Sequence, residues 1–255
     1  MLFRSQYMQS LGVNAGGAGW TGAVNLEDKN LFATLRFRHV NANFNDKMGL
    51  IPFTNYQGFS GFMEWGAQWR KGFWRAFEVS FFPVWDWDLS GIPFNRSGGL
   101  QAMLETRGDT GIGVFLQGGK FYDSNDFTYG FNLIRGMNNR FKSWGINFVT
   151  GQQESLPYTS VDPSFSFRFG KRFDLVYTSS LQSYQGFNQQ QIVTFNYEIN
   201  PYQSWGGRVV IQNTVNFYLS YRNAGRKGTD FYFVIGDPNA SAFVPRFLAK
   251  WVFAF

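Results

Sequence analysis

The last segment of the chain, residues 245–255, alternates between apolar and polar side chains. Successive side chains of an extended strand point to opposite faces. One face of this segment carries only apolar side chains, namely Phe247, Ala249, Trp251, Phe253 and Phe255. The other face includes the cations Arg246 and Lys250. This pattern predicts a β-strand that separates an apolar medium from a polar interior, as in the wall of a membrane barrel.

The composition fits such alternation along the whole chain. Aromatic residues make up 20% of the sequence, with 31 Phe, yet the mean hydropathy is only -0.25. Apolar residues must therefore be interleaved with polar ones. The densest apolar runs, 79–85 and 231–236, have the length of strands and fall short of the roughly 18 residues of a membrane helix. This excludes a helical membrane protein, so the remaining way to cross a bilayer is a closed barrel.

Turn residues separate the alternating segments. The clearest hairpin is 163–182, where Gly170-Lys171 divides two segments with aromatic residues on one face and Ser, Arg and Asp on the other. Further turn sequences lie at 71–72, 107–110, 136–139 and 237–240. Over 205–222 the alternation does not distinguish one long strand from two.

These patterns predict an all-β fold, an antiparallel up-and-down transmembrane β-barrel of about 14 strands. We expect a single barrel domain over 1–255, with 1–19 as an irregular or non-native start. Residues 1–20 lack the apolar region of a secretory signal. We therefore expect a C-terminal fragment of a larger protein, with a barrel that is incomplete at its N-terminal end. The soluble alternatives are a β-sandwich or a propeller, whose aromatic faces would pack inward.

The polar faces of the predicted strands supply candidate lumen-facing charges of both signs. The cations are Arg36, Arg38, Arg168, Arg172, Arg208, Arg222, Arg246 and Lys250, and the carboxylates are Glu64, Glu78, Asp174 and Glu198. The surplus of cations predicts either an anion-favouring lumen or a site for acidic glycans or lipopolysaccharide phosphates. In the alternative, which the mixture of signs on neighbouring strands favours, cations and carboxylates brace a narrow lumen through mutual hydrogen bonds.

Several other chemistries are disfavoured. The chain has no cysteine, which excludes disulfides, thiolate metal sites and cysteine nucleophiles, and we expect no metal or cofactor. The net charge of +6 comes from scattered Lys and Arg residues without a basic run, so we expect no nucleic-acid partner.

We also expect no enzymatic activity. The single histidine, His39, falls on the apolar face of its strand, where an interfacial anchor is expected more than a general base. Asp86 and Asp88 share a face beside Trp85 and Trp87, which suggests a two-carboxylate glycosidase site. A strand end with interfacial Trp and solvated Asp residues explains the same pattern more simply.

One segment resembles a known family. Residues 44–52 read FNDKMGLIP and resemble a motif, approximately F-N-P-E-V-G-F-V-P-R, of an uncharacterised outer-membrane barrel domain that follows a family-nine carbohydrate-binding-like domain. The residues in common are Phe44, Asn45, Gly49 and Pro52. Asp46 replaces the proline of the motif, and Phe53 replaces its final arginine. Any role of that arginine in the family therefore cannot be assigned to this chain. Residues 217–223 and the terminal strand also resemble the closing strands of that family.

The resemblance implies a location in the outer membrane of a diderm bacterium. Barrels there commonly end in an aromatic strand that the assembly machinery reads, and Phe247, Trp251, Phe253 and Phe255 are similar to that signal. The implied partners are outer-membrane lipid, lipopolysaccharide, the barrel-assembly machinery and glycans. We expect the barrel to anchor or translocate for an upstream carbohydrate-binding-like domain. The alternatives are an anion- or glycan-permeable transport barrel, the C-terminal part of a nutrient receptor and, least favoured, a barrel hydrolase.

Overall fold

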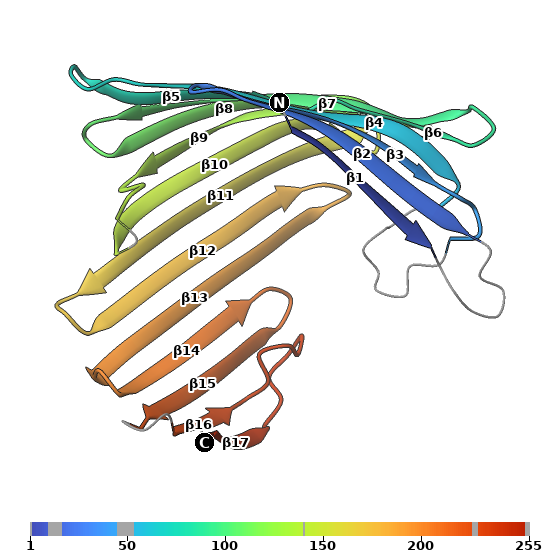
Figure 1. The fold of residues 1–255 in the computed structure, drawn as a ribbon. Helices are drawn as coiled ribbons and strands as arrows, with labels where there is room; N and C mark the ends of the chain where they lie inside the picture. The colour runs from blue at the N-terminus through green and yellow to red at the C-terminus, as the bar shows by residue number, and fades with distance from the viewer. Residues whose placement is uncertain (1, 10–16, 45–53, 140, 226–228, 253–255) are drawn as a thin grey trace. The chain divides into compact units, whose positions relative to one another are not determined.

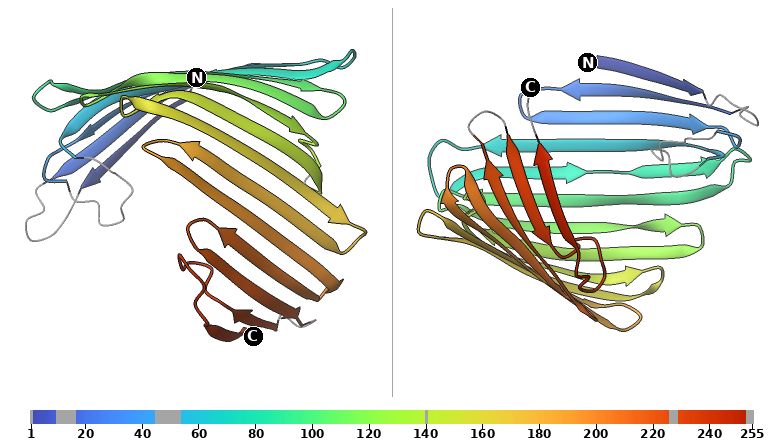
Figure 2. Two further views of the ribbon diagram at one scale, coloured as in Figure 1. Left: turned by 180° about the vertical axis from the view of Figure 1, so that it is seen from behind. Right: turned by 90° about the horizontal axis from the view of Figure 1, so that it is seen from below.

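The computed structural model describes residues 2–9, 17–44, 54–139, 141–225 and 229–252, with the backbone alone for 2–9. Within these residues the chain forms seventeen β-strands and no helix. The strands make one antiparallel sheet in up-and-down order, and Figures 1 and 2 show successive strands side by side. The described residues contain no helix that is long and apolar enough to cross a membrane. The predicted all-β, up-and-down antiparallel fold is therefore confirmed.

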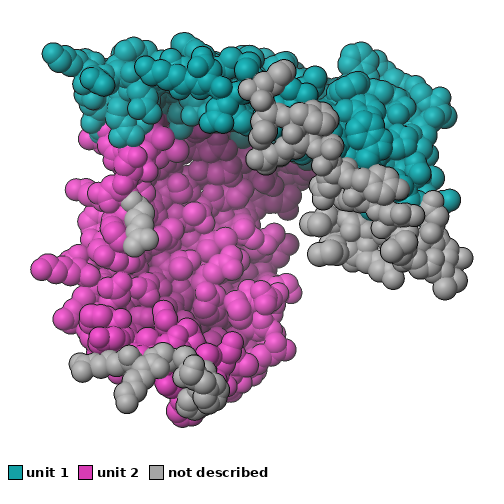
Figure 3. All heavy atoms as spheres, viewed as in Figure 1, with its two compact units in different colours: residues 1–108, 112–131, 149–158 teal, residues 109–111, 132–148, 159–255 magenta. Residues whose placement is uncertain are grey.

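The chain divides into two compact units, coloured separately in Figure 3. Unit 1 comprises residues 1–108, 112–131 and 149–158, and unit 2 comprises residues 109–111, 132–148 and 159–255. The strands of unit 1 alone are β1 (Leu2–Gln9), β2 (Ala18–Glu27), β3 (Leu31–Val40), β4 (Tyr56–Gln68), β5 (Trp74–Phe81), β6 (Val84–Asp88) and β7 (Pro93–Thr106).

Four strands contribute residues to both units, and these are β8 (Thr110–Phe121), β9 (Ser124–Arg135), β10 (Lys142–Gln153) and β11 (Leu156–Phe169). The strands of unit 2 alone are β12 (Phe173–Ser183), β13 (Phe187–Asn200), β14 (Gln203–Ile211), β15 (Val215–Ala224), β16 (Asp230–Ile235) and β17 (Phe247–Val252).

β5 and β6 are two parts of one strand line that is interrupted at Pro83. β4 pairs with both parts, joining Met63 to Phe81 and Ser60 to Val84 in a single register. Proline lacks the N–H that a ladder needs, but its carbonyl still accepts a hydrogen bond of 2.8 Å from the amide of Gly61. When β5 and β6 are counted as one, the described residues form sixteen strand lines. The sequence had predicted about 14 strands.

The structure also differs from the expected irregular start over 1–19. Residues 2–9 form β1, which pairs along its whole length with β2. The open question over 205–222 is resolved as two strands, β14 and β15, joined by a turn in which the amide of Gln212 donates to the carbonyl of Thr214 at 3.0 Å. The predicted hairpin of 163–182 is confirmed, with Arg168 opposite Asp174 across the Gly170 turn.

In unit 2 the alternation places apolar and polar side chains on separate faces. Cross-strand pairing produces continuous apolar rows, of which one is Phe165, Tyr177, Val193, Val209 and Phe217. The opposite face carries polar rows, of which one is Arg168, Asp174, Asn196, Gly206 and Ser220. The same parity therefore persists from β11 to β15, and each strand has one apolar and one polar face.

Unit 1 has the same two-faced organisation. One apolar row runs through Leu26, Ala33, Met63, Phe81 and Leu100. A row on the opposite face runs through Ala23, Arg36, Ser60, Val84 and Ser97. We refer to the two faces of each unit as its apolar face and its polar face.

The distribution of burial is the reverse of that in a water-soluble globular protein. Large apolar side chains of the apolar face are exposed, with Leu35 at 55% and Val114 at 55%. Polar side chains such as Ser160 and Ser179 are instead buried. Within the described residues the buried apolar side chains are Val40, Phe44, Tyr56 and Phe94. The expected alternative of a sandwich, with aromatic faces packed inward, does not agree with this pattern.

Candidate functional site

Most of the predicted charges of unit 2 lie on the polar face, and several form ion pairs. Arg168 of β11 makes a two-point contact with Asp174 of β12, in which Nη2 donates to Oδ2 at 2.5 Å and Nε donates to Oδ1. Glu198 of β13 lies 3.6 Å from the same guanidinium. The guanidinium also lies over the ring of Phe141, 3.6 Å from its centroid. The charges of three adjacent strands are thus drawn into one network, which fits the expected bracing.

Two further pairs involve carboxylates that sequence reasoning did not single out. Nη2 of Arg222 donates to Oδ2 of Asp230 at 3.1 Å, and the hydroxyl of Tyr232 donates to the same oxygen at 3.0 Å. Nη1 of Arg246 lies 2.6 Å from Oδ2 of Asp237. These carboxylates belong to the start of β16 and to the turn after it, so their partners depend on strand register and not on spacing in the sequence.

The remaining cations of unit 2 are less engaged. Arg172 lies in the turn before β12, where its carbonyl accepts a 2.8 Å hydrogen bond from the amide of Glu198. Arg208 and Lys250 lie on the polar face, opposite Tyr218 and Tyr232. Within the described part of the chain, neither Arg208 nor Lys250 has a carboxylate within 4.0 Å.

In unit 1 the predicted charges also share the polar face. Glu64 lies opposite Ser80, and Glu78 lies opposite Gly66, so both carboxylates occupy the β4–β5 pair. Arg36 lies opposite Ser60. Nη1 of Arg38 donates to the hydroxyl of Tyr56 at 3.0 Å. An ion pair that sequence reasoning missed joins Arg75 to Glu105 at 2.8 Å.

A small apolar cluster accompanies Tyr56. Val40 lies opposite Tyr56 in the β3–β4 pair, and the rings of Tyr56 and Phe94 meet edge to face with centroids 6.1 Å apart. Phe44, the first residue of the motif FNDKMGLIP, is buried in the same cluster. The rest of that motif, 45–52, lies outside the described residues. The aromatic position of the motif therefore has a packing role.

His39 lies beside one aromatic and two amide side chains. Register places it on the apolar face of unit 1, opposite Trp20 and Gln57. Its Nε2 lies 2.9 Å from Oδ1 of Asn41, and its Nδ1 lies 3.3 Å from Oε1 of Gln57. Among the described residues no carboxylate or serine is bonded to the ring, so the arrangement of a hydrolase triad is not formed.

Asp86 and Asp88 share one face, as expected, but serve different contacts. Oδ2 of Asp86 accepts a hydrogen bond of 2.9 Å from Nδ2 of Asn95 on β7. Oδ1 of Asp88 instead accepts from the amides of Ser90 and Ile92 at 2.9 and 2.8 Å, and so holds the turn after β6. Asp88 is thus a turn residue, and the expectation of a strand end describes it better than a catalytic pair.

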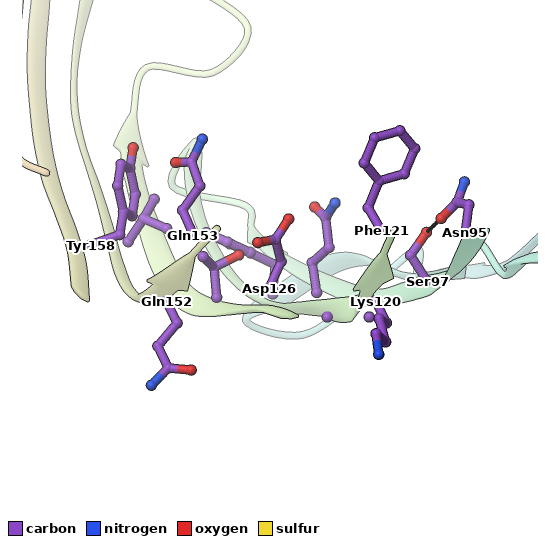
Figure 4. Close-up of a pocket in the computed structure, with 14 residues that line it drawn as sticks. Asn95, Ser97, Lys120, Phe121, Asp126, Gln152, Gln153 and Tyr158 are labelled. Atoms are coloured by element: carbon purple, nitrogen blue, oxygen red, sulfur yellow. Dashed lines mark hydrogen bonds between the residues drawn. The ribbon is translucent and has the colours of Figure 1, made fainter. Parts of the chain in front are cut away.

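A pocket of about 510 Å³ lies on the polar face of unit 1 and was not predicted from the sequence. Its lining comes from five strands, β7 to β11, with Asn95, Ser97, Gln117, Asp126, Gln153 and Tyr158 among the residues. Figure 4 shows Asn95, Asp126, Gln153 and Tyr158 on one side of the sheet, whereas Lys120 and Gln152 project to the other. The side of each residue follows strand parity.

Close approach of two strands creates the floor of the pocket. A Cβ added to Gly119 of β8 would lie 2.3 Å from the carbonyl oxygen of Arg96 and 2.4 Å from Cα of Ser97. Only glycine permits β7 and β8 to approach so closely at this point. Because Gly119 has no side chain, the polar face is bare at this position. The side chains of the neighbouring lining residues surround it and form the walls of the pocket.

The terminal strand is described as far as Val252. Phe247 and Trp251 of β17 are 69% and 64% exposed. Their rings contact the apolar face of β16, with centroids of Phe231 and Trp251 separated by 4.7 Å. Phe253 and Phe255 of the proposed assembly signal lie outside the described residues. The described residues contain no cluster of side chains suited to a metal ion.

Comparisons with protein-family models, curated proteins and solved structures returned no match to this chain. The family resemblance of residues 44–52 therefore remains an expectation from the sequence.

Proposed function

We propose that this chain is an outer-membrane β-barrel of a diderm bacterium, with its apolar face against lipid and its polar face lining the interior. The barrel anchors or translocates for an upstream carbohydrate-binding-like domain. Its partners are outer-membrane lipid, lipopolysaccharide, the barrel-assembly machinery and glycans. The exposed apolar face is the observation that carries the proposal. Exposed aromatic residues in row after row are costly in water but favourable against hydrocarbon.

Two further features support the proposal. The described residues form sixteen strand lines in up-and-down order, and bacterial outer-membrane barrels have even strand numbers. Several charges of the polar face are held in pairs, as in the Arg168–Asp174 contact and the Arg222–Asp230 contact. Such pairs allow charges to lie inside a wall whose outer surface is apolar.

The ion pairs bear on the choice between anchoring and anion transport. Arg168, Arg222 and Arg246 each have a carboxylate partner, so three of the eight candidate cations are neutralised locally. This favours the bracing role over an anion-selective lumen. The mostly neutral lining of the pocket in unit 1 favours glycan passage as the second candidate function.

The experiment that tests the barrel is refolding from urea into lauryldimethylamine oxide micelles and into phospholipid vesicles. We expect a heat-modifiable band on SDS gels and β-sheet circular dichroism only when detergent or lipid is present. A monomer that folds in buffer without either would contradict the proposal. Planar-bilayer recordings then distinguish anchoring from transport. An anchor gives no conductance, whereas a transport barrel gives stepwise increases in current.

A further inference from the structure

The pocket on the polar face of unit 1 has a lining dominated by neutral hydrogen-bonding groups. Gln117 of β8, Thr128 of β9 and Gln153 of β10 line it from three successive strands. Within the described part of the chain, none of their side chains makes a hydrogen bond. Amide and hydroxyl groups both donate and accept hydrogen bonds. The pocket thus presents unengaged donors and acceptors from several directions.

Three further polar residues of the pocket, Asn95, Ser97 and Asp126, are already held in place. The hydroxyl of Ser97 donates to Oδ1 of Asn95 at 2.8 Å, and Asn95 in turn donates to Asp86. Oδ1 of Asp126 accepts from the amide of Glu154 at 2.5 Å, in the turn between β10 and β11. These contacts fix the walls before a ligand arrives, which reduces the entropy lost on binding.

Aromatic side chains complete the lining. Figure 4 shows Tyr158 at one end of the lining and Phe121 well apart from it, with both rings on the side of the sheet that carries the pocket. Phe115 of β8 also lines it. Aromatic faces offer apolar contact to a flat ligand surface, and the phenol of tyrosine adds a polar group.

The charges limit which ligand the pocket can hold. Lys120 is the one cation among its described lining residues, and its side chain projects away from the pocket (Figure 4). A phosphate or carboxylate ligand would therefore have no counter-charge. Asp126 is the one carboxylate of the described lining, which is too few for a polycation or a metal ion. The volume of about 510 Å³ falls within the range of small-molecule sites.

We propose that this pocket binds a neutral oligosaccharide, with sugar hydroxyls bonded to Gln117, Thr128 and Gln153 and a ring face against Tyr158. A sugar offers many hydroxyl groups that donate and accept, together with an apolar C–H face, and so matches both parts of the lining. The inference rests on the proposed barrel, of which it would be an interior glycan subsite, and it names the substrate class of the glycan-permeable alternative.

The test is isothermal titration calorimetry on the full chain in lauryldimethylamine oxide, a detergent that carries no sugar. The probes are maltohexaose, cellohexaose and chitohexaose as neutral chains, and hexagalacturonate as an anionic chain. We expect at least one neutral hexasaccharide to bind and hexagalacturonate to bind at least tenfold more weakly. Gln153→Ala and Tyr158→Leu should each weaken binding by about tenfold. Gln152→Ala is the matched control and should leave the affinity unchanged, because Gln152 projects from the other side of the sheet.

Three results would overturn the inference. They are the absence of binding by every neutral chain, tighter binding of hexagalacturonate, and an equal loss of affinity in the Gln152→Ala and Gln153→Ala variants. A heat-modifiable band in the same preparations distinguishes the two proposals. Folded protein without sugar binding contradicts the glycan site alone, whereas protein that folds in plain buffer contradicts the barrel.

Discussion

Arg168 and Asp174 face each other across β11 and β12 and are joined by two parallel hydrogen bonds on the polar face of unit 2. Their side chains are only 23% and 22% exposed. Bidentate geometry makes this pair stronger than a single charge-assisted hydrogen bond. Arg208 lies on the same face but has no carboxylate within 4.0 Å among the described residues, so it serves as an internal comparison.

We expect Arg168→Met to lower the urea midpoint of the folded chain, because it removes the two hydrogen bonds that Asp174 accepts from that side chain. The double variant Arg168→Met with Asp174→Leu should recover part of that loss, since both charges of the pair are then removed together. Urea titration of protein folded in vesicles measures both. Arg208→Met should change the unfolding free energy by less than about 0.5 kcal/mol. If Arg208→Met destabilised the chain as much as Arg168→Met, the ion pair with Asp174 would not be the cause of the loss.

The two faces of β11 can be compared with neighbouring substitutions. Phe165 lies on the apolar face opposite Tyr177, and Ser164 lies on the polar face opposite Thr178. In a lipid bilayer Phe165→Arg should cost about 2–4 kcal/mol, as a cation on the lipid face does near the midplane. Ser164→Arg should insert and fold much as the parent does. Equal tolerance of both variants in a vesicle-folding assay would place lipid on neither face.

Gly119 is expected to be intolerant of any side chain. Gly119→Ala would put a methyl group within 2.4 Å of the backbone of β7, which forces β7 and β8 apart. We expect a loss of about 2 kcal/mol or more in the unfolding free energy. Gly66→Ala is the control, because the nearest atom to an added Cβ there is the carbonyl oxygen of Phe77 at 3.4 Å. Similar unfolding midpoints for the two variants would contradict the close approach.

We expect neither His39 nor Asp86 to act as a catalytic residue. His39→Gln keeps a hydrogen-bonding side chain beside Asn41 and Gln57, and Asp86→Asn keeps a partner for Asn95. We expect both variants to fold normally and the parent to show no turnover of phospholipid or neutral glycan above buffer. Turnover that disappears in either variant, measured by release of fatty acid or reducing sugar, would establish an enzyme.

Alternation along each strand was sufficient to predict the all-β architecture, the hairpin of 163–182 and the shared face of Arg168 and Asp174. The reason is that side-chain parity in a strand is a local property, independent of what the strand pairs with. Parity also predicted that His39 lies on the apolar face. In the structure it lies on that face, opposite Trp20.

Other features depended on the tertiary structure, because they arise between strands. The partner of Arg222 is Asp230, which follows from the register of β15 and β16 and not from any spacing in the chain. The pocket of unit 1 exists because Gly119 meets Ser97 across two strands and because side chains of five strands surround that gap. A sequence determines which face each side chain occupies, whereas only the paired sheet decides which side chains become neighbours on that face.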